Sequence, residues 1–183
     1  MTNDAADGLS IQGSLRSGDG KGVVHLEGRF RALIDDLWSA ITNPGRLAEW
    51  HAHVEGDLHP GGTFRRYVEA DDWDGTGRVE VCENPRRLVV TTRESEESWR
   101  KGQGAPPFDA TLEATLTSDG DQTILVLEIR GVPLEPIAHF GVGWQIHMEK
   151  LAAYLEGSDF GDTDARWDDL ISTYQDLATE IRK

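Results

Sequence analysis

A single long helix, predicted from Pro136 to Glu156, constrains the fold of this chain more than any other stretch. Its large apolar side chains recur three or four positions apart, which places them along one side of a helix. They are Ile137, Phe140, Trp144, Met148, Leu151 and Leu155. Proline is favoured in a first helical turn, and Gly157 stands where a left-handed cap would end the helix. An apolar side of this length must be covered by the rest of the chain.

Two glycines, Gly141 and Gly143, lie in the middle of this helix. Each costs about 1 kcal/mol relative to alanine, because glycine loses more backbone entropy on folding than any other residue. Close approach of another segment would account for them, and so would space left for a bound molecule. The sequence leaves both explanations open.

The length of 183 residues and the hydrophobic content of 38% fit one globular domain with a single core. The sequence has no run of about 18 apolar residues that could span a bilayer, and no basic segment followed by an apolar stretch at its start. Its one cysteine, Cys82, excludes an intramolecular disulfide. We therefore expect a soluble, cytoplasmic protein without membrane insertion.

The charge balance is strongly acidic, with 33 Asp and Glu residues against 18 Lys and Arg residues and a net charge of −15. A surface of this sign repels phosphate backbones and anionic lipid headgroups. We therefore expect no nucleic-acid partner, and the acidic surface is sufficiently explained as a source of solubility.

The N-terminal third of the chain is predicted to form two strands and then two helices. Residues 1–8 are expected to be flexible. Apolar alternation over residues 9–30, around a Ser-Gly-Asp-Gly turn, predicts a β-hairpin. The period then changes to that of a helix over residues 32–41. Asn43 can cap a second short helix over residues 44–50, with proline at its first position.

Only strands are predicted between these helices and the long one, each ended by residues typical of turns. They are expected over residues 54–59, 63–69, 78–83, 87–93, 108–116 and 123–130. Consecutive strands with short connections form an antiparallel meander, and alternation in most strands means that one face is covered. The predicted fold class is therefore α+β, with a curved antiparallel sheet wrapped around the long C-terminal helix. Trp73 and Trp99 fall in the two longer loops of this region.

Residues 158–183 repeat apolar side chains at helical spacing. These side chains are Trp167, Leu170, Tyr174, Leu177 and Ile181. Asp162 or Thr163 can cap this helix at its N-terminus. We expect a helical extension of a domain at residues 9–157, either packed back on that domain or used to form a homodimer.

Five segments of the chain carry a resemblance to a known superfamily. They read LWSAITNPGRLAEW from Leu37, VEGDLHPGGTF from Val54, GRVEVCENPRRLVVT from Gly77, TLTSDGDQTILVL from Thr115 and GWQIHMEKLAAYLEG from Gly143. Together they resemble the START/polyketide-cyclase superfamily, also called SRPBCC, and within it the branch of the activator of heat-shock-protein ATPase. The resemblance covers residues 9–157.

This resemblance implies a helix-grip fold, in which the sheet wraps around the C-terminal helix and the two short helices close one end. It also implies a cavity between sheet and helix that accepts an apolar small molecule. The chaperone activator carries an additional N-terminal domain for which 183 residues leave no room. Direct chaperone activation is therefore not expected.

The common signatures of nucleophilic, phosphate-binding, dinucleotide-binding and zinc-dependent enzymes do not occur in the sequence. No cofactor is therefore expected. His51 and His53 could share one side of a strand and hold a metal, but a third ligand is not evident, so no metal site is expected. His147 falls beside the apolar side of the long helix, where it could line a cavity or bond to a backbone carbonyl.

The strand at residues 63–69 contains Arg65 and Arg66, and either parity groups one of them with apolar side chains. An arginine turned into a cavity must find an anion, because an unpaired buried charge is costly. It would anchor a ligand carboxylate or enolate, or else pair with an acid of the sheet. The residues expected to line the cavity are Trp38, Trp50, Phe64, Arg66, Phe140, Trp144, His147 and Met148.

The leading functional interpretation is binding of a hydrophobic or amphipathic small molecule in this cavity. Apolar burial would supply the affinity, and one or two polar groups would orient the guest. One alternative is a cyclase- or hydrolase-like enzyme that uses the same cavity, with His147 or Arg66 handling a proton or an oxyanion. Another alternative is a co-chaperone-like interaction module that uses a sheet edge or the terminal helix.

Overall fold

The computed structural model describes residues 9–100 and 106–183, apart from the side chains of residues 98 and 99. The predicted flexible segment 1–8 and the Trp99 side chain therefore lie outside the described residues. The strands are β1 (Ile11–Gly18), β2 (Lys21–Phe30), β3 (His53–Gly56), β4 (Thr63–Val68), β5 (Trp73–Glu83), β6 (Arg87–Glu94), β7 (Asp109–Asp119) and β8 (Gln122–Val132). The helices are α1 (Ile34–Thr42), α2 (Pro44–Trp50), α3 (Glu96–Arg100), α4 (Ile137–Glu156) and α5 (Thr163–Glu180), with a 3-10 turn at Glu69–Asp71. In these ranges no helix combines the length and the apolar character that a bilayer span needs.

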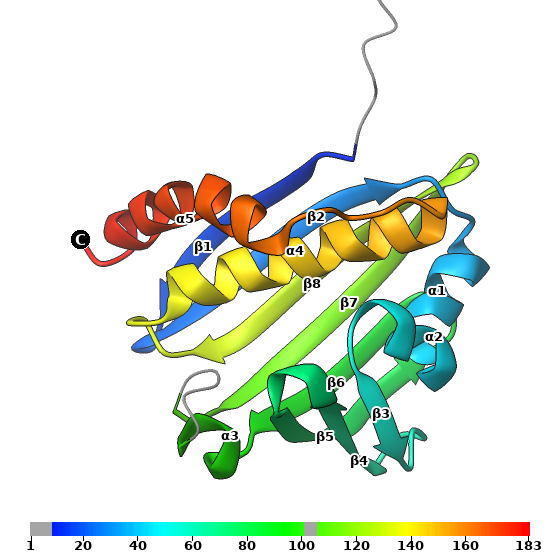
Figure 1. Ribbon diagram of the computed structural model, residues 1–183, viewed down its shortest axis with the longest axis horizontal. Helices are drawn as coiled ribbons and strands as arrows, with labels where there is room; N and C mark the ends of the chain where they lie inside the picture. The colour runs from blue at the N-terminus through cyan, green and yellow to red at the C-terminus, as the bar shows by residue number, and fades with distance from the viewer. Residues whose placement is uncertain (1–8, 101–105) are drawn as a thin grey trace, which may run out of the picture.

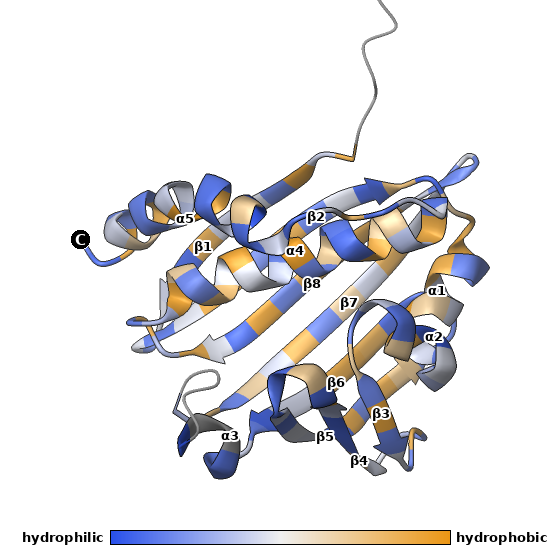
Figure 2. Cartoon of the chain, viewed as in Figure 1, coloured by the Kyte–Doolittle hydropathy of each residue, from blue (hydrophilic) through white to orange (hydrophobic). Residues whose placement is uncertain are grey.

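Within the described residues, the strands form one antiparallel sheet in the order β1-β2-β8-β7-β6-β5-β4-β3 (Figure 1). Strands β3 to β8 pair in chain order as a meander, and the N-terminal hairpin β1–β2 joins it beside β8. Apolar and polar residues alternate along β2, β7 and β8 (Figure 2). This architecture confirms the predicted α+β helix-grip fold.

The two short helices follow the hairpin as predicted. The Asn43 side chain accepts a hydrogen bond from the Arg46 backbone N–H at 3.2 Å and so caps α2. The Arg46 guanidinium donates to the Tyr154 hydroxyl on α4 at 3.0 Å and to the Asp36 carboxylate on α1 at 2.9 Å. These contacts hold α1 and α2 against the C-terminal half of α4 and close this end of the sheet (Figure 1).

Helix α4 lies across one face of the sheet and ends at Gly157, whose φ of 67° makes it the predicted left-handed cap (Figure 1). The buried side of α4 differs from the expected one. Phe140 and Trp144 are only partly buried, whereas Gly141 and Gln145 are buried. The difference arises because α4 is covered on a second side by α5.

Helix α5 packs in cis against α4 and β1, and Asp162 is its N-terminal cap. Tyr174 of α5 is buried, and its hydroxyl donates to Gln145 Oε1 at 2.7 Å. A Cβ atom added to Gly13 or to Gly141 would overlap with the Tyr174 side chain. These two glycines therefore form a notch for the Tyr174 ring, and close packing explains the glycine at position 141.

Some element boundaries differ from the expected ones. Strand β3 is short and ends at Gly56, and helix α3 occupies part of an expected loop. Strand β5 begins at Trp73 rather than at Arg78, because the chain turns back sooner than expected. Asp72 adopts the left-handed conformation with a φ of 48°, which lets Trp73 pair with Val68 across the turn.

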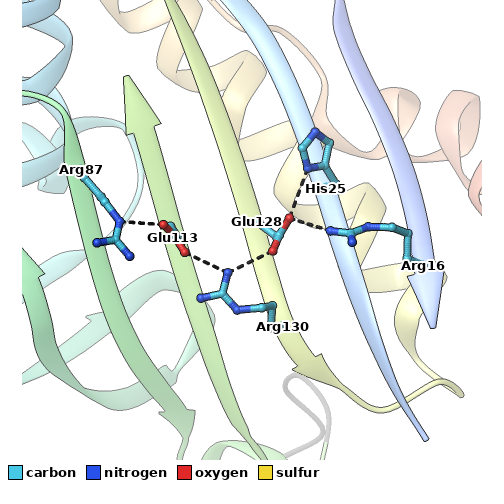
Figure 3. Close-up of polar contacts among 6 residues, drawn as sticks. All are labelled: Arg16, His25, Arg87, Glu113, Glu128 and Arg130. Atoms are coloured by element: carbon cyan, nitrogen blue, oxygen red, sulfur yellow. Dashed lines mark hydrogen bonds and ion pairs between the residues drawn. The ribbon is translucent and has the colours of Figure 1, made fainter. Parts of the chain in front are cut away.

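The sheet face opposite α4 carries a row of charged side chains (Figure 3). Glu128 in β8 accepts hydrogen bonds from Arg16 at 2.6 Å and from Arg130 at 3.0 Å. Glu113 in β7 accepts from Arg130 at 2.9 Å and from Arg87 at 2.7 Å. Pairs of this kind each contribute less than about 1 kcal/mol, but together they keep the face polar. This face of the sheet therefore offers little apolar surface around these residues.

Candidate ligand-binding cavity

An inner chamber of about 170 Å³ lies between α4, the α1–α2 pair and strands β3 to β8. Most of its wall consists of Leu, Val, Ile, Phe, Met and Trp side chains. The polar side chains in the wall are Thr42, His51, Arg66, Thr92 and His147. An apolar cavity of about 150 Å³ in another protein stays dry and binds benzene. The inner chamber is therefore large enough for an apolar group the size of one aromatic ring.

An outer chamber of about 980 Å³ adjoins the inner one, between the N-terminal half of α4, α5 and the sheet. Exposed residues such as Asp71, Glu135 and His139 lie on its wall, so this chamber opens to solvent. The residues that line both chambers are His51, Arg66, Thr92, Leu112, Trp144 and His147. We call this shared wall the junction. The two chambers meet at these six side chains.

The register of β4 decides which of its two arginines faces the cavity. Arg66 lines both chambers, together with Phe64 in the inner one. Arg65 points the other way, where its Nε lies 3.4 Å from an Asp74 carboxylate oxygen and its guanidinium lies over the Tyr67 ring. The cavity arginine is thus Arg66.

The other residues predicted to line the cavity fall into three groups. Trp50 and Met148 lie on the inner chamber only, whereas Trp144 and His147 line both chambers. Phe140 lies on the outer chamber only. Trp38, which was also expected to line the cavity, is buried in the hydrophobic core and lines neither chamber. Ligand contact by the lining residues stays a prediction.

An aromatic cluster surrounds His51, the residue that directly follows α2. The His51 ring centroid lies 4.5 Å from that of His147, 5.6 Å from that of Trp144 and 5.2 Å from that of Trp50. Burial lowers the pKa of His51 well below its ordinary value and lowers that of His147 to about 4, and the nearby positive charges act in the same direction. Both imidazoles are therefore neutral at pH 7.

Three nitrogen atoms at the junction are buried without a hydrogen-bond partner: His51 Nδ1, His147 Nδ1 and Arg66 Nε. Native proteins pair nearly all buried polar groups, so each such atom requires an explanation. Their convergence on one wall of a cavity is typical of a binding or catalytic site. It also answers the question left open for His147, which makes no hydrogen bond to a backbone carbonyl through this atom.

The structure separates the two histidines that were considered as a metal-binding pair. His53 is exposed and stacks on Tyr67 with the ring centroids 5.1 Å apart, whereas His51 faces the cavity. No group of three His, Cys, Asp or Glu residues within the described ranges is arranged to hold a metal ion.

Sequence reasoning missed three residues of the cavity. His51 was considered as a possible metal ligand together with His53, not as a cavity residue. Trp73 lies under the Arg66 guanidinium, with 4.7 Å between Cζ and the ring centroid, and lines the outer chamber. Trp167 of α5 lines the same chamber. In the sequence, Trp73 was expected in a loop and Trp167 on the apolar side of the terminal helix.

The fold, with its two chambers beside α4, is that of a helix-grip protein of the START/polyketide-cyclase superfamily. Residues 31–156 match the family described as activator of Hsp90 ATPase homolog 1-like protein, and the chain belongs to this family. The matched region ends with the last residue of α4. Helix α5, which holds Trp167 against the outer chamber, lies beyond it.

Several solved structures share the fold. The crystal structure of CalU16 from Micromonospora echinospora is 24% identical, with a TM-score of 0.73 over 93% of this chain and 98% of that one. Protein MLL2253 from Mesorhizobium loti is 21% identical, with a TM-score of 0.65 over 75% of this chain and 98% of that one. DynU16, a protein of the dynemicin biosynthetic locus, is 25% identical, with a TM-score of 0.64 over 75% of this chain and 49% of that one. This chain thus spans about half of DynU16. No curated protein matches it.

Proposed function

We propose that the protein binds an amphipathic small molecule in the two joined chambers. The observation that supports this proposal is the junction. There, buried nitrogen atoms without hydrogen-bond partners line a cavity whose other walls are mostly apolar. Burial of the apolar surface of the guest would contribute about 25 cal/mol of binding free energy per Å². The polar groups would fix the orientation of the guest. The similarity to a protein of the dynemicin biosynthetic locus is consistent with a small-molecule guest.

Leu112→Trp is expected to weaken binding of a small apolar probe at least tenfold. Leu112 lies at the junction, so a larger side chain there obstructs the way into the inner chamber. The probe is toluene, an uncharged molecule of one ring. Its affinity is measured by NMR from the shift of the indole N–H signal of Trp144, a residue that lines both chambers.

The matched control is Leu33→Trp, which makes the same substitution at a side chain that is 63% exposed. This variant should bind toluene as the unaltered protein does. Equal toluene affinity in all three proteins, or no toluene binding at all, would refute the proposal. Native mass spectrometry of the protein purified from cells then tests for a natural guest that copurifies with it.

A second candidate function, catalysis at the junction, is favoured by the neutral imidazoles of His51 and His147 beside the Arg66 guanidinium. A neutral imidazole can accept a proton from a carbon acid, and a guanidinium can stabilise the enolate oxygen that forms. This activity would appear as faster exchange of the methyl hydrogens of acetophenone in deuterated water. The acceleration should be lost in His147→Gln if the imidazole is the base, and no acceleration in the unaltered protein would exclude this reaction of acetophenone.

A further inference from the structure

Arg66 is held in the cavity by its neighbours on the sheet and by an aromatic ring. Its strand neighbours are Val54 on β3 and Gly75 on β5. A Cβ atom at position 75 would lie 3.4 Å from Arg66 Nε, which is an ordinary contact distance, so Gly75 lies directly beside the guanidinium. The Trp73 ring covers the guanidinium from one side, 4.7 Å from Cζ. These contacts position the charge without neutralising it.

Arg66 forms no ion pair with a carboxylate of the described residues, although Glu94 lies on the wall of the same outer chamber. Its Nε is buried and makes no hydrogen bond. Burial lowers the pKa of Arg66 to about 10, although the charge of Glu94 acts in the opposite direction, so the guanidinium stays protonated at pH 7. A buried charge without a partner is costly, and an anion that enters the cavity would offset this cost.

Hydrogen-bond donors from α4 and from the end of α2 face the same place. His51 and His147 have their ring centroids 4.5 Å apart, and both line the junction with Arg66. A neutral imidazole carries one N–H donor, so each ring can donate to an oxygen atom of a guest. The charge of Lys150 adds to the positive surroundings of both rings. The junction therefore suits an oxygen atom that carries negative charge.

On the basis of the proposed function, we propose that the guest is an amphipathic acid whose carboxylate, or ionised phenol or enol, binds Arg66 at the junction. A ring-sized apolar group attached to this oxygen fills the inner chamber. The rest of the molecule extends into the outer chamber. Hydrogen bonds from a guanidinium to an anionic oxygen are about twice as strong as neutral ones. The shape of the inner chamber would thus select the apolar part of the guest, and the charge of Arg66 would select its acid group.

The test compares two probes of the same shape, 3-phenylpropanoate and the neutral 3-phenylpropanamide. The unaltered protein should bind the acid at least tenfold more tightly than the amide in a calorimetric or NMR titration. Arg66→Gln should abolish this preference while changing the affinity for the amide less than twofold. Arg65→Gln, which removes the outward-facing arginine of the same strand, should keep the preference.

Equal affinity of the unaltered protein for both probes would overturn the acid assignment, and so would a preference that persists in Arg66→Gln. The first comparison needs no variant, so it holds even if Arg66→Gln does not fold. Toluene separates this inference from the proposed function. If toluene binds but the acid is not preferred, only the acid assignment fails. If toluene does not bind, the proposed function fails as well.

Discussion

Gly141→Ala is expected to lower the free energy of unfolding by about 3 kcal/mol, which is large for the addition of one methyl group. The new Cβ would overlap with the Tyr174 ring, and the ring cannot retreat because Gly13 confines it on the other side. Displacing the ring would also strain the hydrogen bond from its hydroxyl to Gln145, worth about 1 kcal/mol. These losses exceed the gain of about 1 kcal/mol from replacing glycine in a helix. Urea unfolding followed by circular dichroism measures the change.

Gly143→Ala, one half-turn further along α4, is the matched control and should have the opposite sign. Its Cβ would meet nothing closer than a Trp167 ring carbon at 3.9 Å, an ordinary contact distance. Only the gain in helix propensity remains, so this variant should be more stable by up to about 1 kcal/mol. If both variants are stabilised, the notch described for Tyr174 does not confine the ring.

Local signals in the sequence were sufficient for most of the fold. Asn43 followed by proline predicts the start of α2, and the structure shows the capping hydrogen bond. Gly157 predicts the end of α4, and Asp162 was one of the two caps predicted for α5. Strand alternation predicted the antiparallel meander. In each case the physical cause lies within a few residues of the position it determines.

The candidate site was harder to predict, because its residues are placed by distant contacts. Both parities of β4 combine one arginine with apolar neighbours, so only the pairing with β3 and β5 shows that Arg66 faces inward. His51 directly follows a short helix, a position that by itself indicates exposure to water. It is partly buried, because α2 packs beside α4, which brings His147 and Trp144 against it.

The packing of α5 was also hard to predict from the sequence, because it depends on distant contacts. Apolar spacing identified Tyr174 as part of a buried helix face, but not the surface that receives it. That surface consists of Gly13 in β1 and Gly141 in α4, which lie far apart in the sequence. Each glycine on its own has several explanations, and only the folded arrangement shows that both serve one aromatic ring.

Acidification from pH 7 to pH 4 is expected to destabilise the protein by about 3 kcal/mol through His147 alone. Burial, together with the charges of Lys150 and Arg66, lowers the pKa of His147 to about 4 in the folded state. In the unfolded chain its pKa returns to about 6.5. Between these two pKa values the unfolded state binds more protons than the folded state. The contribution of His147 to the free energy of unfolding is therefore fully present above about pH 6.5 and is lost as the pH falls. His51, whose pKa is lowered in the same direction, adds to the loss.

His147→Gln isolates this contribution, because glutamine keeps a polar side chain at the junction but cannot titrate near neutral pH. Denaturant midpoints are compared for the two proteins at intervals from pH 7 to pH 4. Carboxylates such as Glu113, whose pKa is lowered by Arg87, also stabilise the protein less in acid. This loss is equal in both proteins and cancels when their free energies of unfolding are compared. The unaltered protein should therefore lose about 3 kcal/mol more than the variant over this range. Parallel curves would mean that His147 is not kept neutral by burial, and the wall of the inner chamber would then be more hydrated than its apolar lining implies.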